Sequence, residues 1–378
     1  MAKEYRPQIP DKVKIRLWTS SGGRCQFDNC NKVLWRNELT MAQMNTSYIA
    51  HIYAFSPNGP RYDKTLSPNL EKDLSNLMLV CDPCHRTFDD EAQVDIYPAS
   101  RLIEMKKDHE NRIEFLTSIQ PDKKSHIVLF GAKIGEHNSP LQFNKSVQAI
   151  LPDYYPANHN PIELGLKNSS FNDSDDMYWQ FEAENLKNIF IEKLGSIKAN
   201  HKVQHYSVFG LAPQPLLIKF GTLLNDLYPA DIYQLHREPS TWKWLDHEDD
   251  IDLIIEEPIE HNKIIALKIA LSASISNDRI TSILGDDISI WSVTLPSPSN
   301  DFLQSRKHLK LIRECFRSLF DKIKNKHGQD AELNIFPAMP VSVAIEFGRV
   351  WMPKADLPFT IYDQNRTMGG FHKTLKIE

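Results

Sequence analysis

The chain has 378 residues, of which 41% are hydrophobic and 25% charged, and its mean hydropathy is −0.43. This length favours two or three domains, and no apolar run reaches the roughly 20 residues that a membrane span needs. The N-terminus lacks the apolar core of a secretion signal, so we expect a cytoplasmic protein. The net charge of −5 is unlike that of a protein coated with nucleic acid, although the first 36 residues hold 8 basic and 3 acidic side chains.

The first part of the chain predicts a small domain with little apolar core. A helix is expected from about residue 12, ended by Gly22 and Gly23, which tolerate a left-handed backbone. The stretch that follows is polar and turn-rich, with a loop signal at 56–60. An amphipathic helix is expected at 100–119, and the polar residues 120–124 mark a linker. We therefore place the first domain at 1–119 and the second at 125–378.

The second part has a different pattern. Strands that are apolar on both faces and alternate with helices indicate an α/β sheet covered on both sides. A polar loop is expected at 166–177, and we recognise no internal repeat. Helical patterns cover 216–227 and 301–325. The apolar runs typical of buried strands lie at 126–130, 203–209, 264–271, 288–295 and 341–347.

Four of the five cysteines form two close pairs. Cys25 and Cys30 have the spacing C-x4-C, and Cys81 and Cys84 have the spacing C-x2-C. In a cytosolic chain, cysteine pairs at such spacing indicate metal ligands in preference to disulfides. Four thiolates complete the tetrahedral shell of Zn²⁺, so the pattern predicts a closed structural zinc site that staples the first domain. Cys315 lies in the helical pattern of 301–325 and is expected to be a small core residue.

Three polar residues accompany the cysteine pairs. His51 lies in an apolar, strand-like context, Asn76 stands five residues before Cys81, and His85 directly follows Cys84. This order of a cysteine pair, His, Asn and Cys-x-x-Cys-His resembles the HNH endonucleases of the ββα-metal class over about residues 16–115. The resemblance implies an α+β, zinc-stapled nuclease domain. It also implies hydrolysis of double-stranded DNA with a separate divalent cation, commonly Mg²⁺.

The chemistry of each residue agrees with such a role. A histidine whose pKa lies near neutrality can take a proton from water at working pH, which suits His51 as the general base. A divalent cation can stabilise the leaving oxygen of a phosphodiester. His85 is the expected ligand of that cation. Asn76 would either help to hold the cation or orient His51.

One position departs from the pattern of the family. Many members carry an acidic metal ligand just before the base, and this chain has Ala50 there. The metal shell is then formed either by His85 and Asn76 alone or with a contribution from Asp89 or Asp90. The other polar residues noted here are two arginines for phosphate contact and one histidine with a structural role, namely Arg61, Arg86 and His109.

Candidate ligand-binding residues of the second domain lie where predicted strands end. Loops at the carboxyl ends of such strands bind ligands, and the segments after 203–209 and 264–271 have a suitable composition. Aromatic and arginine side chains can stack on bases and neutralise phosphates, although both tryptophans are equally expected as packing residues. The candidates are Pro213, Gln214, Lys219, Tyr233, Arg237, Trp242, Trp244, Ser272 and Ser274.

The segments GLAPQPLLIKFG, YQLHREPSTWKW and LSASISNDRI, after an HNH-like domain, resemble the SAVED-domain effectors of cyclic-oligonucleotide anti-phage signalling (CBASS). The resemblance implies that the second domain consists of two fused CARF-like, Rossmann-like halves. It implies binding of a cyclic di- or trinucleotide made by a partner nucleotidyltransferase. It further implies assembly into a dimer or tetramer, which activates DNA degradation as an abortive infection response.

Two other classes of function remain open. The chain could be a restriction-type HNH enzyme whose second domain reads modified or specific DNA. Residues 121–378 hold 28 basic and 33 acidic side chains, and this acidic balance argues against that function. It could also be a zinc-bound sensor without catalysis. The set of His51, Asn76 and His85 argues against that alternative.

Overall fold

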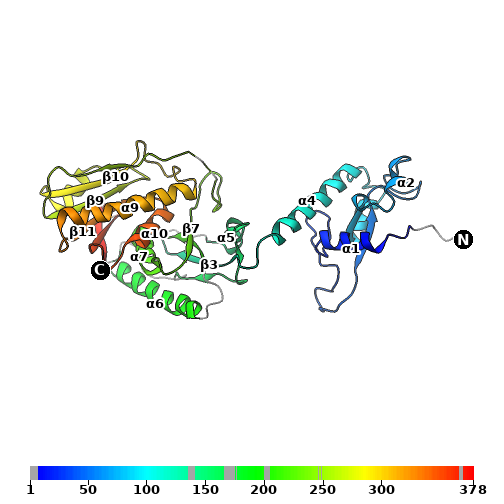
Figure 1. Cartoon of the computed structure of the whole chain (residues 1–378), viewed down its shortest axis with the longest axis horizontal. Helices are drawn as coiled ribbons and strands as arrows, with labels where there is room; N and C mark the ends of the chain where they lie inside the picture. The colour runs from blue at the N-terminus through cyan, green and yellow to red at the C-terminus, as the bar shows by residue number, and fades with distance from the viewer. Residues whose placement is uncertain are drawn as a thin grey trace. The chain divides into compact units, whose positions relative to one another are not determined.

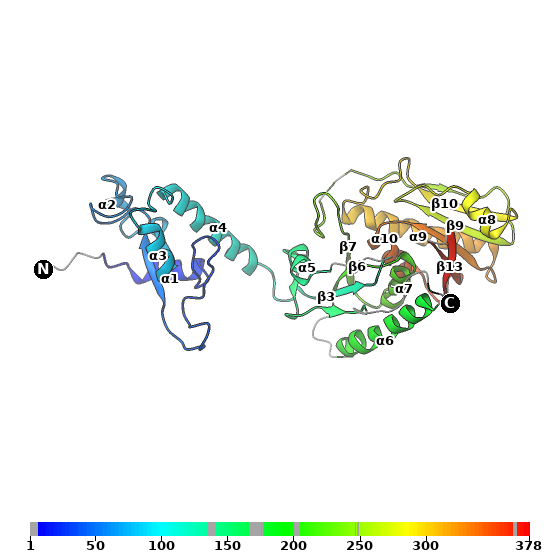
Figure 2. The same cartoon turned by 180° about the vertical axis from the view of Figure 1, so that it is seen from behind.

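The computed structural model describes residues 7–134, 141–165, 175, 177–199, 205–245, 247, 249–365 and 369–378. Its contacts divide the chain into two compact units, Met1–Gln120 and Pro121–Glu378 (Figure 1 and Figure 2). We call them the N-terminal and the C-terminal unit. Most of the polar loop expected at 166–177 lies outside the described residues. A search of the described helices finds none suited to cross a membrane.

The N-terminal unit is built around a two-stranded antiparallel sheet that is followed by a helix. His51 of β1 lies opposite Leu77 of β2, and Ser47 lies opposite Cys81. All residues of β2 are buried, because α1 and α3 both pack on this strand. Burial of each large apolar side chain contributes about 1.5–3 kcal/mol. In chain order the elements are α1 (Asp11–Ser20), β1 (Ser47–His51), α2 (Leu66–Leu70), η1 (Leu74–Asn76), β2 (Leu77–Cys81), α3 (Asp82–Asp89) and α4 (Ala99–Thr117).

The backbone groups on both edges of β2 form hydrogen bonds with segments that precede this strand in the chain. β1 occupies one edge. On the other edge the backbone N–H of Gln26 donates to the carbonyl of Leu79 over 2.9 Å. The Gln26 side chain completes the contact, because its Oε1 accepts from the backbone N–H of Leu79 over 2.7 Å. The loop after α1, which carries Cys25 and Cys30 and is called the cysteine loop here, is thereby joined to the central strand β2.

The two helices expected in this unit are confirmed as α1 and α4. Gly22 and Gly23 follow α1 with φ angles of 60° and 64°. A Cβ on Gly23 would lie 3.0 Å from Cδ1 of Trp35. The turn therefore needs glycine both for its left-handed backbone and for the close approach of a ring.

The C-terminal unit contains two sheets with parallel centres. In the first, β4, β3, β6 and β7 lie in this order, β5 also pairs with β3, and all pairs are parallel. In the second the order is β13-β12-β11-β9-β10-β8, and only the edge strands β13 and β8 are antiparallel to their neighbours. The α/β class expected for this part of the chain is confirmed.

The elements of the first half are β3 (Lys124–Gly131), α5 (Phe143–Ile150), β4 (Tyr155–Pro156), β5 (Ile162–Glu163), α6 (Tyr178–Ala199), β6 (Tyr206–Leu211), α7 (Gln214–Leu224) and β7 (Ala230–Tyr233). Those of the second half are β8 (Ile254–Glu256), β9 (Ile264–Ala270), α8 (Asp278–Leu284), β10 (Ile288–Thr294), α9 (Arg306–His327), β11 (Leu333–Ala338), α10 (Val341–Val350), β12 (Phe359–Gln364) and β13 (Phe371–Ile377). Four of the five apolar runs form strands as expected, namely β3, β6, β9 and β10.

The fifth apolar run, at 341–347, is a helix, so the strand expected there is wrong. α10 packs against α7, α9 and β6, and all residues from Ser342 to Val350 are buried. A helix covered on every side is apolar on every side, and such a short run cannot be told from a buried strand by periodicity. Pro340, with φ of −59°, stands directly before the helix, a position where proline suits a helix start.

An internal repeat relates the two halves, although we recognise none in the sequence alone. α7 and α10 lie against each other at the centre of the unit (Figure 1 and Figure 2). Each helix follows a parallel strand, and the strand–helix pairs carry five identical residues at the same spacing. These are Phe209, Pro213, Ile218, Phe220 and Gly221 in the first pair and Phe336, Pro340, Ile345, Phe347 and Gly348 in the second. The matches are short and far apart in the chain, which is why the sequence alone did not show them.

Candidate active site

The four paired cysteines come together in the N-terminal unit. Cys25 and Cys30 lie in the loop after α1, Cys81 ends β2, and Cys84 lies in the first turn of α3. Their Sγ atoms all lie within 4.8 Å of one another, and none forms a disulfide. Cys25 and Cys81 are buried. Within the described ranges, no other group of three or more His, Cys, Asp or Glu side chains is close enough to share an ion.

The cluster fits a tetrahedral cation. A tetrahedron of thiolates with metal–sulfur bonds of about 2.3 Å places its sulfur atoms roughly 3.8 Å apart. The Sγ atoms of Cys30 and Cys81 are 3.8 Å apart. Burial raises the pKa of the Cys25 thiol to about 12 and also raises the pKa of Cys84. Four thiolates in this space would therefore need a cation to offset their charge, and Zn²⁺ meets that need.

His51 lies at the end of β1 and lines a cavity of about 390 Å³ together with His85 and Asp89. Its Nε2 is 2.9 Å from the carbonyl oxygen of Glu71. A carbonyl only accepts, so Nε2 carries the proton and Nδ1 remains as the nitrogen that can take one. Burial lowers the pKa of His51 below its ordinary value, although the Glu71 carbonyl opposes this shift. The side chain is therefore neutral near pH 7.

His85 and Asp89 lie one turn apart on α3. Nε2 of His85 is 3.2 Å from Oδ2 of Asp89, and its ring stacks on that of Tyr48 at 5.1 Å between centroids. Ala50 lines the same cavity, so Asp89 supplies a carboxylate close to the position where β1 has none. Asp90 is exposed, and its Oδ1 accepts from the backbone N–H of Ala92 over 2.8 Å. Of the two aspartates expected as alternatives, the structure brings Asp89 to the cavity.

Asn76 is not placed as a metal ligand, in contrast to one of its two expected roles. It is 1% exposed and is absent from the lining of the cavity. Its Oδ1 accepts from the backbone N–H of Tyr53 over 2.7 Å. Its Nδ2 donates to the carbonyls of Tyr53 and Leu70 over 3.1 and 3.3 Å. These bonds tie down the backbone just after His51.

The two arginines considered for phosphate contact differ. Arg61 has a side chain that is 5% exposed and bonded to protein groups, so the expected phosphate contact is wrong for this residue. Sequence could not reveal its burial, because an arginine in a turn-rich stretch is ordinarily solvated. Arg86 is exposed on α3, and its Nε pairs with Asp82 at 3.0 Å.

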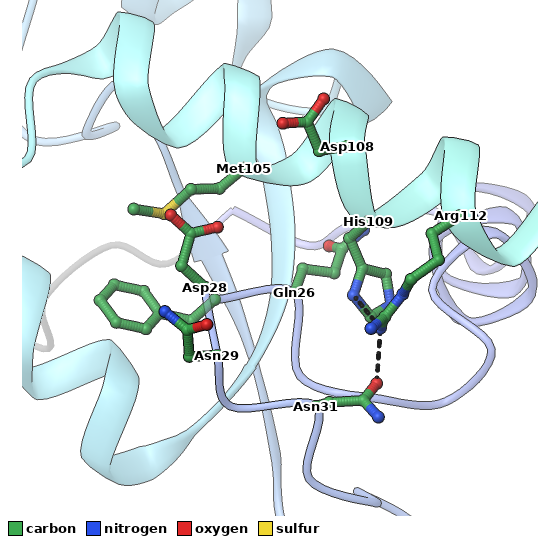
Figure 3. A pocket seen from close by; sticks show the side chains of 9 residues that line it. Gln26, Asp28, Asn29, Asn31, Met105, Asp108, His109 and Arg112 are labelled. Carbon is green, nitrogen blue, oxygen red and sulfur yellow. Dashed lines mark hydrogen bonds between the residues drawn. The ribbon is translucent and has the colours of Figure 1, made fainter. Parts of the chain in front are cut away.

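A second hollow of the same unit, of about 310 Å³, lies between the cysteine loop and α4 (Figure 3). Asp28 and Asn29 face Asp108 and His109 across it (Figure 3). Nε2 of His109 is 2.9 Å from the carbonyl oxygen of Ser21, and its Nδ1 is 3.3 Å from Nη2 of Arg112. His109 therefore joins the end of α1 to α4, in agreement with the structural role expected for it.

The candidate ligand residues of the C-terminal unit divide into buried and accessible groups. Tyr233 and Trp242 are 0% and 3% exposed and belong to the core, so their expected stacking on a ligand is wrong for this structure. The ring of Tyr233 instead stacks on that of Phe209, and the ring of Trp242 meets that of Phe209 edge to face. Pro213 is buried before α7, Gln214 and Lys219 are half-buried on that helix, and burial lowers the pKa of Lys219. Arg237 and Ser274 are exposed.

Six buried side-chain polar atoms of this unit make no hydrogen bond within the described part of the chain. Three of them lie in loops, namely Nε2 of His236, Nε1 of Trp244 and Oγ of Ser272. The rings of His236 and Trp244 are 5.7 Å apart, and Ser272 follows the carboxyl end of β9. Buried polar groups are ordinarily paired, so these atoms are available to a bound molecule. His236 lies in the same short segment as the expected residues Tyr233 and Arg237.

Comparison with known proteins identifies the C-terminal unit. Residues 186–377 match the model of the SAVED family, described as "SMODS-associated and fused to various effectors sensor domain". A search of curated proteins found no match.

Several solved structures are similar to the chain. One is the Acinetobacter baumannii Cap4 SAVED/CARF-domain containing receptor, at 11% identity and a TM-score of 0.43, over 83% of this chain and 66% of that one. The same receptor with the cyclic trinucleotide 3'3'3'-cAAA gives 13% identity and a TM-score of 0.44, over 84% and 71%. The Moraxella osloensis receptor gives 9% identity and a TM-score of 0.43, over 84% and 70%.

Proposed function

The chain belongs to the SAVED family, and from this premise we propose that it is a metal-dependent HNH-type endonuclease that a cyclic di- or trinucleotide switches on. The family is described as a sensor fused to effectors. We assign the sensor to the C-terminal unit and the effector to the N-terminal unit. The substrate is double-stranded DNA, and the response is abortive infection during anti-phage defence in the cytoplasm.

One observation carries the nuclease assignment. His51 at the end of a β-hairpin shares a cavity with His85 and Asp89 of the helix that follows the second strand. This is a ββα arrangement with a base on one side and two metal-ligand types on the other. The four cysteines lie at the junction of β2 and α3, next to His85. Zn²⁺ held by Cys25, Cys30, Cys81 and Cys84 would fix that junction.

The residues of the cavity supply the parts of phosphodiester hydrolysis. Nδ1 of the neutral His51 takes a proton from the attacking water, while Nε2 stays bonded to the Glu71 carbonyl. His85 and Asp89 would hold a divalent cation such as Mg²⁺, which supplies charge compensation at the scissile phosphate. Asn76 keeps the backbone after His51 in place. The Nδ1 of His51 that can take a proton, the histidine–carboxylate pair and the open cavity together support cleavage better than a purely structural role.

The sensor assignment has support from three loop atoms that make no hydrogen bond within the described residues. His236, Trp244 and Ser272 offer buried groups on loops of the C-terminal unit, where an α/β fold binds its ligands. A cyclic oligonucleotide carries both base edges and phosphates that such groups can bond. Two of the solved receptor structures hold the cyclic trinucleotides 2'3'3'-cAAA and 3'3'3'-cAAA. We propose a ligand of this class here, and a dimer or tetramer as the active form.

The test is plasmid cleavage by the full chain with Mg²⁺ and a panel of cyclic di- and trinucleotides. Cleavage with one nucleotide, and none with His51→Ala, is the expected result. Cleavage without any nucleotide would favour a restriction-type enzyme over a gated one. Tight binding of one nucleotide without cleavage would make the chain a sensor and would remove the nuclease proposal.

A further inference from the structure

Arg61 has more specific contacts than a surface arginine near a phosphate would need. Its Nε donates to the carbonyl of Ile52 over 2.9 Å, and its Nη1 donates to the carbonyl of Phe88 over 2.7 Å. Its Nη2 forms an ion pair with Oδ1 of Asp89. The guanidinium also lies over the ring of Phe88, 5.3 Å from the centroid. One side chain thus joins the segment after His51 to the end of α3.

The backbone of Arg61 adds an independent observation. Its φ is 57°, in the left-handed region that side chains other than Gly, Asn and Asp rarely adopt. A glycine or asparagine would fit this turn with less strain. The side chain is nevertheless an arginine, and it is 5% exposed. The contacts of the guanidinium with its three acceptors therefore explain why an arginine occupies this strained position.

We propose that Arg61 is a positioning residue for the carboxylate of Asp89. It occupies Oδ1 of Asp89, so that Oδ2 faces Nε2 of His85 in the cavity that His51 also lines. A carboxylate held by one oxygen offers the other in a fixed direction, which is the way that supporting groups orient metal ligands. Arg61 thereby compensates for Ala50, because it fixes on α3 the carboxylate that β1 lacks. The inference rests on the proposed metal-dependent activity.

The test measures binding of Mn²⁺ alone to the full chain, by the electron paramagnetic resonance signal of the free ion. Supporting groups of this kind contribute roughly 10- to 100-fold to metal affinity. We expect Arg61→Met to raise the Kd for Mn²⁺ by at least about 10-fold. Arg61→Lys should give an intermediate value, because an ammonium keeps the ion pair but cannot reach all three acceptors. Asp89→Asn should weaken binding at least as much as Arg61→Met.

The combined variant decides whether Arg61 acts through Asp89. With Asp89→Asn already present, Arg61→Lys should weaken Mn²⁺ binding no further. Arg101→Met is the matched control, since Arg101 also contacts a ring and a backbone carbonyl, at Tyr97 and Ile96, but neither of these residues lines the cavity, whereas Arg61 pairs with Asp89, which does. Zinc content and thermal unfolding of each variant separate misfolding from mispositioning. If Arg61→Met does not fold, Arg61→Lys and Asp89→Asn carry the comparison.

Three results would overturn the inference. The first is a folded Arg61→Lys or Arg61→Met variant that binds Mn²⁺ as the unmodified chain does. The second is an unmodified chain that binds no Mn²⁺. The third is an effect of the Arg61 and Asp89 substitutions on Mn²⁺ binding that is additive. Failure of the nuclease proposal looks different. In that case Mn²⁺ binding depends on both residues together, but no nucleotide induces cleavage.

Discussion

Gly221 of α7 and Gly348 of α10 are in direct contact where the two helices cross. A Cβ on Gly348 would lie 2.9 Å from the Cα of Gly221 and 2.0 Å from the carbonyl oxygen of Ile218. A Cβ on Gly221 would meet the carbonyl oxygen of Ile345 at 2.1 Å. Neither helix can move away easily, because both are buried between the sheets. The repeat thus preserves the glycine that each half needs for contact with the other.

Gly348→Ala should destabilise the C-terminal unit strongly. The added methyl group has no space, and overpacking of this kind costs typically about 1–3 kcal/mol, with more expected when backbone atoms must shift. We expect a fall of several degrees in the thermal midpoint of that unit, measured by calorimetry. Gly195→Ala is the control, because a Cβ there meets nothing within 4 Å and alanine favours the helix. Equal midpoints for Gly348→Ala and the unmodified chain would contradict the close packing.

Asn76→Ala should abolish DNA cleavage although Asn76 does not line the cavity of His51. The change removes three hydrogen bonds to backbone groups and leaves the buried N–H of Tyr53 without an acceptor. An unsatisfied buried group costs roughly 1–3 kcal/mol. Hydrogen exchange should report faster exchange at Tyr53, next to the base. Asn69→Ala is the control, since the exposed Asn69 donates only to Thr65. Unchanged exchange at Tyr53 would refute the orienting role.

The pH dependence of cleavage should report a base with a lowered pKa. Burial lowers the pKa of His51 below 6.5, so the base is still neutral where an ordinary histidine is half protonated. The rate should stay constant from pH 8 to pH 7 and fall only below about pH 6.5. A rate that halves above that pH would exclude His51 as the general base. The measurement is a pH–rate profile with the activating nucleotide saturating at every pH.

The stability of the N-terminal unit should also decrease as the pH falls. The folded His51 has the lower pKa, so below pH 6.5 the unfolded chain binds the proton more readily. The contribution of His51 to stability is complete above that pH and is lost as the pH falls towards the folded pKa. His51→Phe, which cannot titrate, should reduce the acid sensitivity of the N-terminal unit in denaturant titrations. An unchanged pH profile of unfolding would contradict the shift.

The cysteine cluster should bind one zinc ion per chain. Cys81→Ser and Cys84→Ser should each release the metal and unfold the N-terminal unit, since a structural zinc site contributes folding energy directly. The C-terminal unit should keep its own thermal transition. Cys315→Ser is the control, because Cys315 packs against the core of the other unit and lies outside the cluster. Metal analysis of the purified variants provides the readout, and a zinc-free but folded N-terminal unit would refute the site.

Trp244→Phe should weaken nucleotide binding without loss of fold. The change keeps an aromatic ring but removes Nε1, which has no partner in the described structure. Loss of one hydrogen bond to the ligand corresponds to about a tenfold rise in Kd. Calorimetric titration with the activating nucleotide measures it. In the control Trp351→Phe the lost Nε1 contact is with the Leu357 carbonyl, so stability should fall while affinity stays constant. An unaltered Kd for Trp244→Phe would place the ligand elsewhere.

The parts of the fold that depend on local pattern were predictable from the sequence. The glycine pair after α1, the two cysteine pairs and the strands β3, β9 and β10 each follow from spacing within a short stretch. α10 was not predictable, because its polarity is set by neighbours on all sides and not by its own periodicity. The repeat was missed for a related reason. Three of its five matching residues lie on the two helices that contact each other, and contact between distant segments is not visible in either segment alone.

The cavity residues show the same limit. His51 and His85 were found from their order along the chain, and the structure brings them to one cavity. The selection of Asp89 over Asp90 depends on which face of α3 meets β1, which the sequence does not specify. Tyr233 and Trp242 were predicted to bind a ligand, but both are buried in the core. The sequence misled here, because residue types suited to bind a base are equally suited to fill a core.

The contact between Gln26 and Leu79 constrains how the N-terminal unit can form during synthesis. Both edges of β2 are filled by earlier segments, so the backbone hydrogen bonds of these segments to β2 cannot form until β2 leaves the ribosome. A nascent chain that stops before Leu77 holds one cysteine pair and His51 but lacks the strand that joins them. The cavity that His51, His85 and Asp89 line therefore cannot assemble on a translation product that stops before β2. On the proposed function, we expect no cleavage by such a product until the central strand is made.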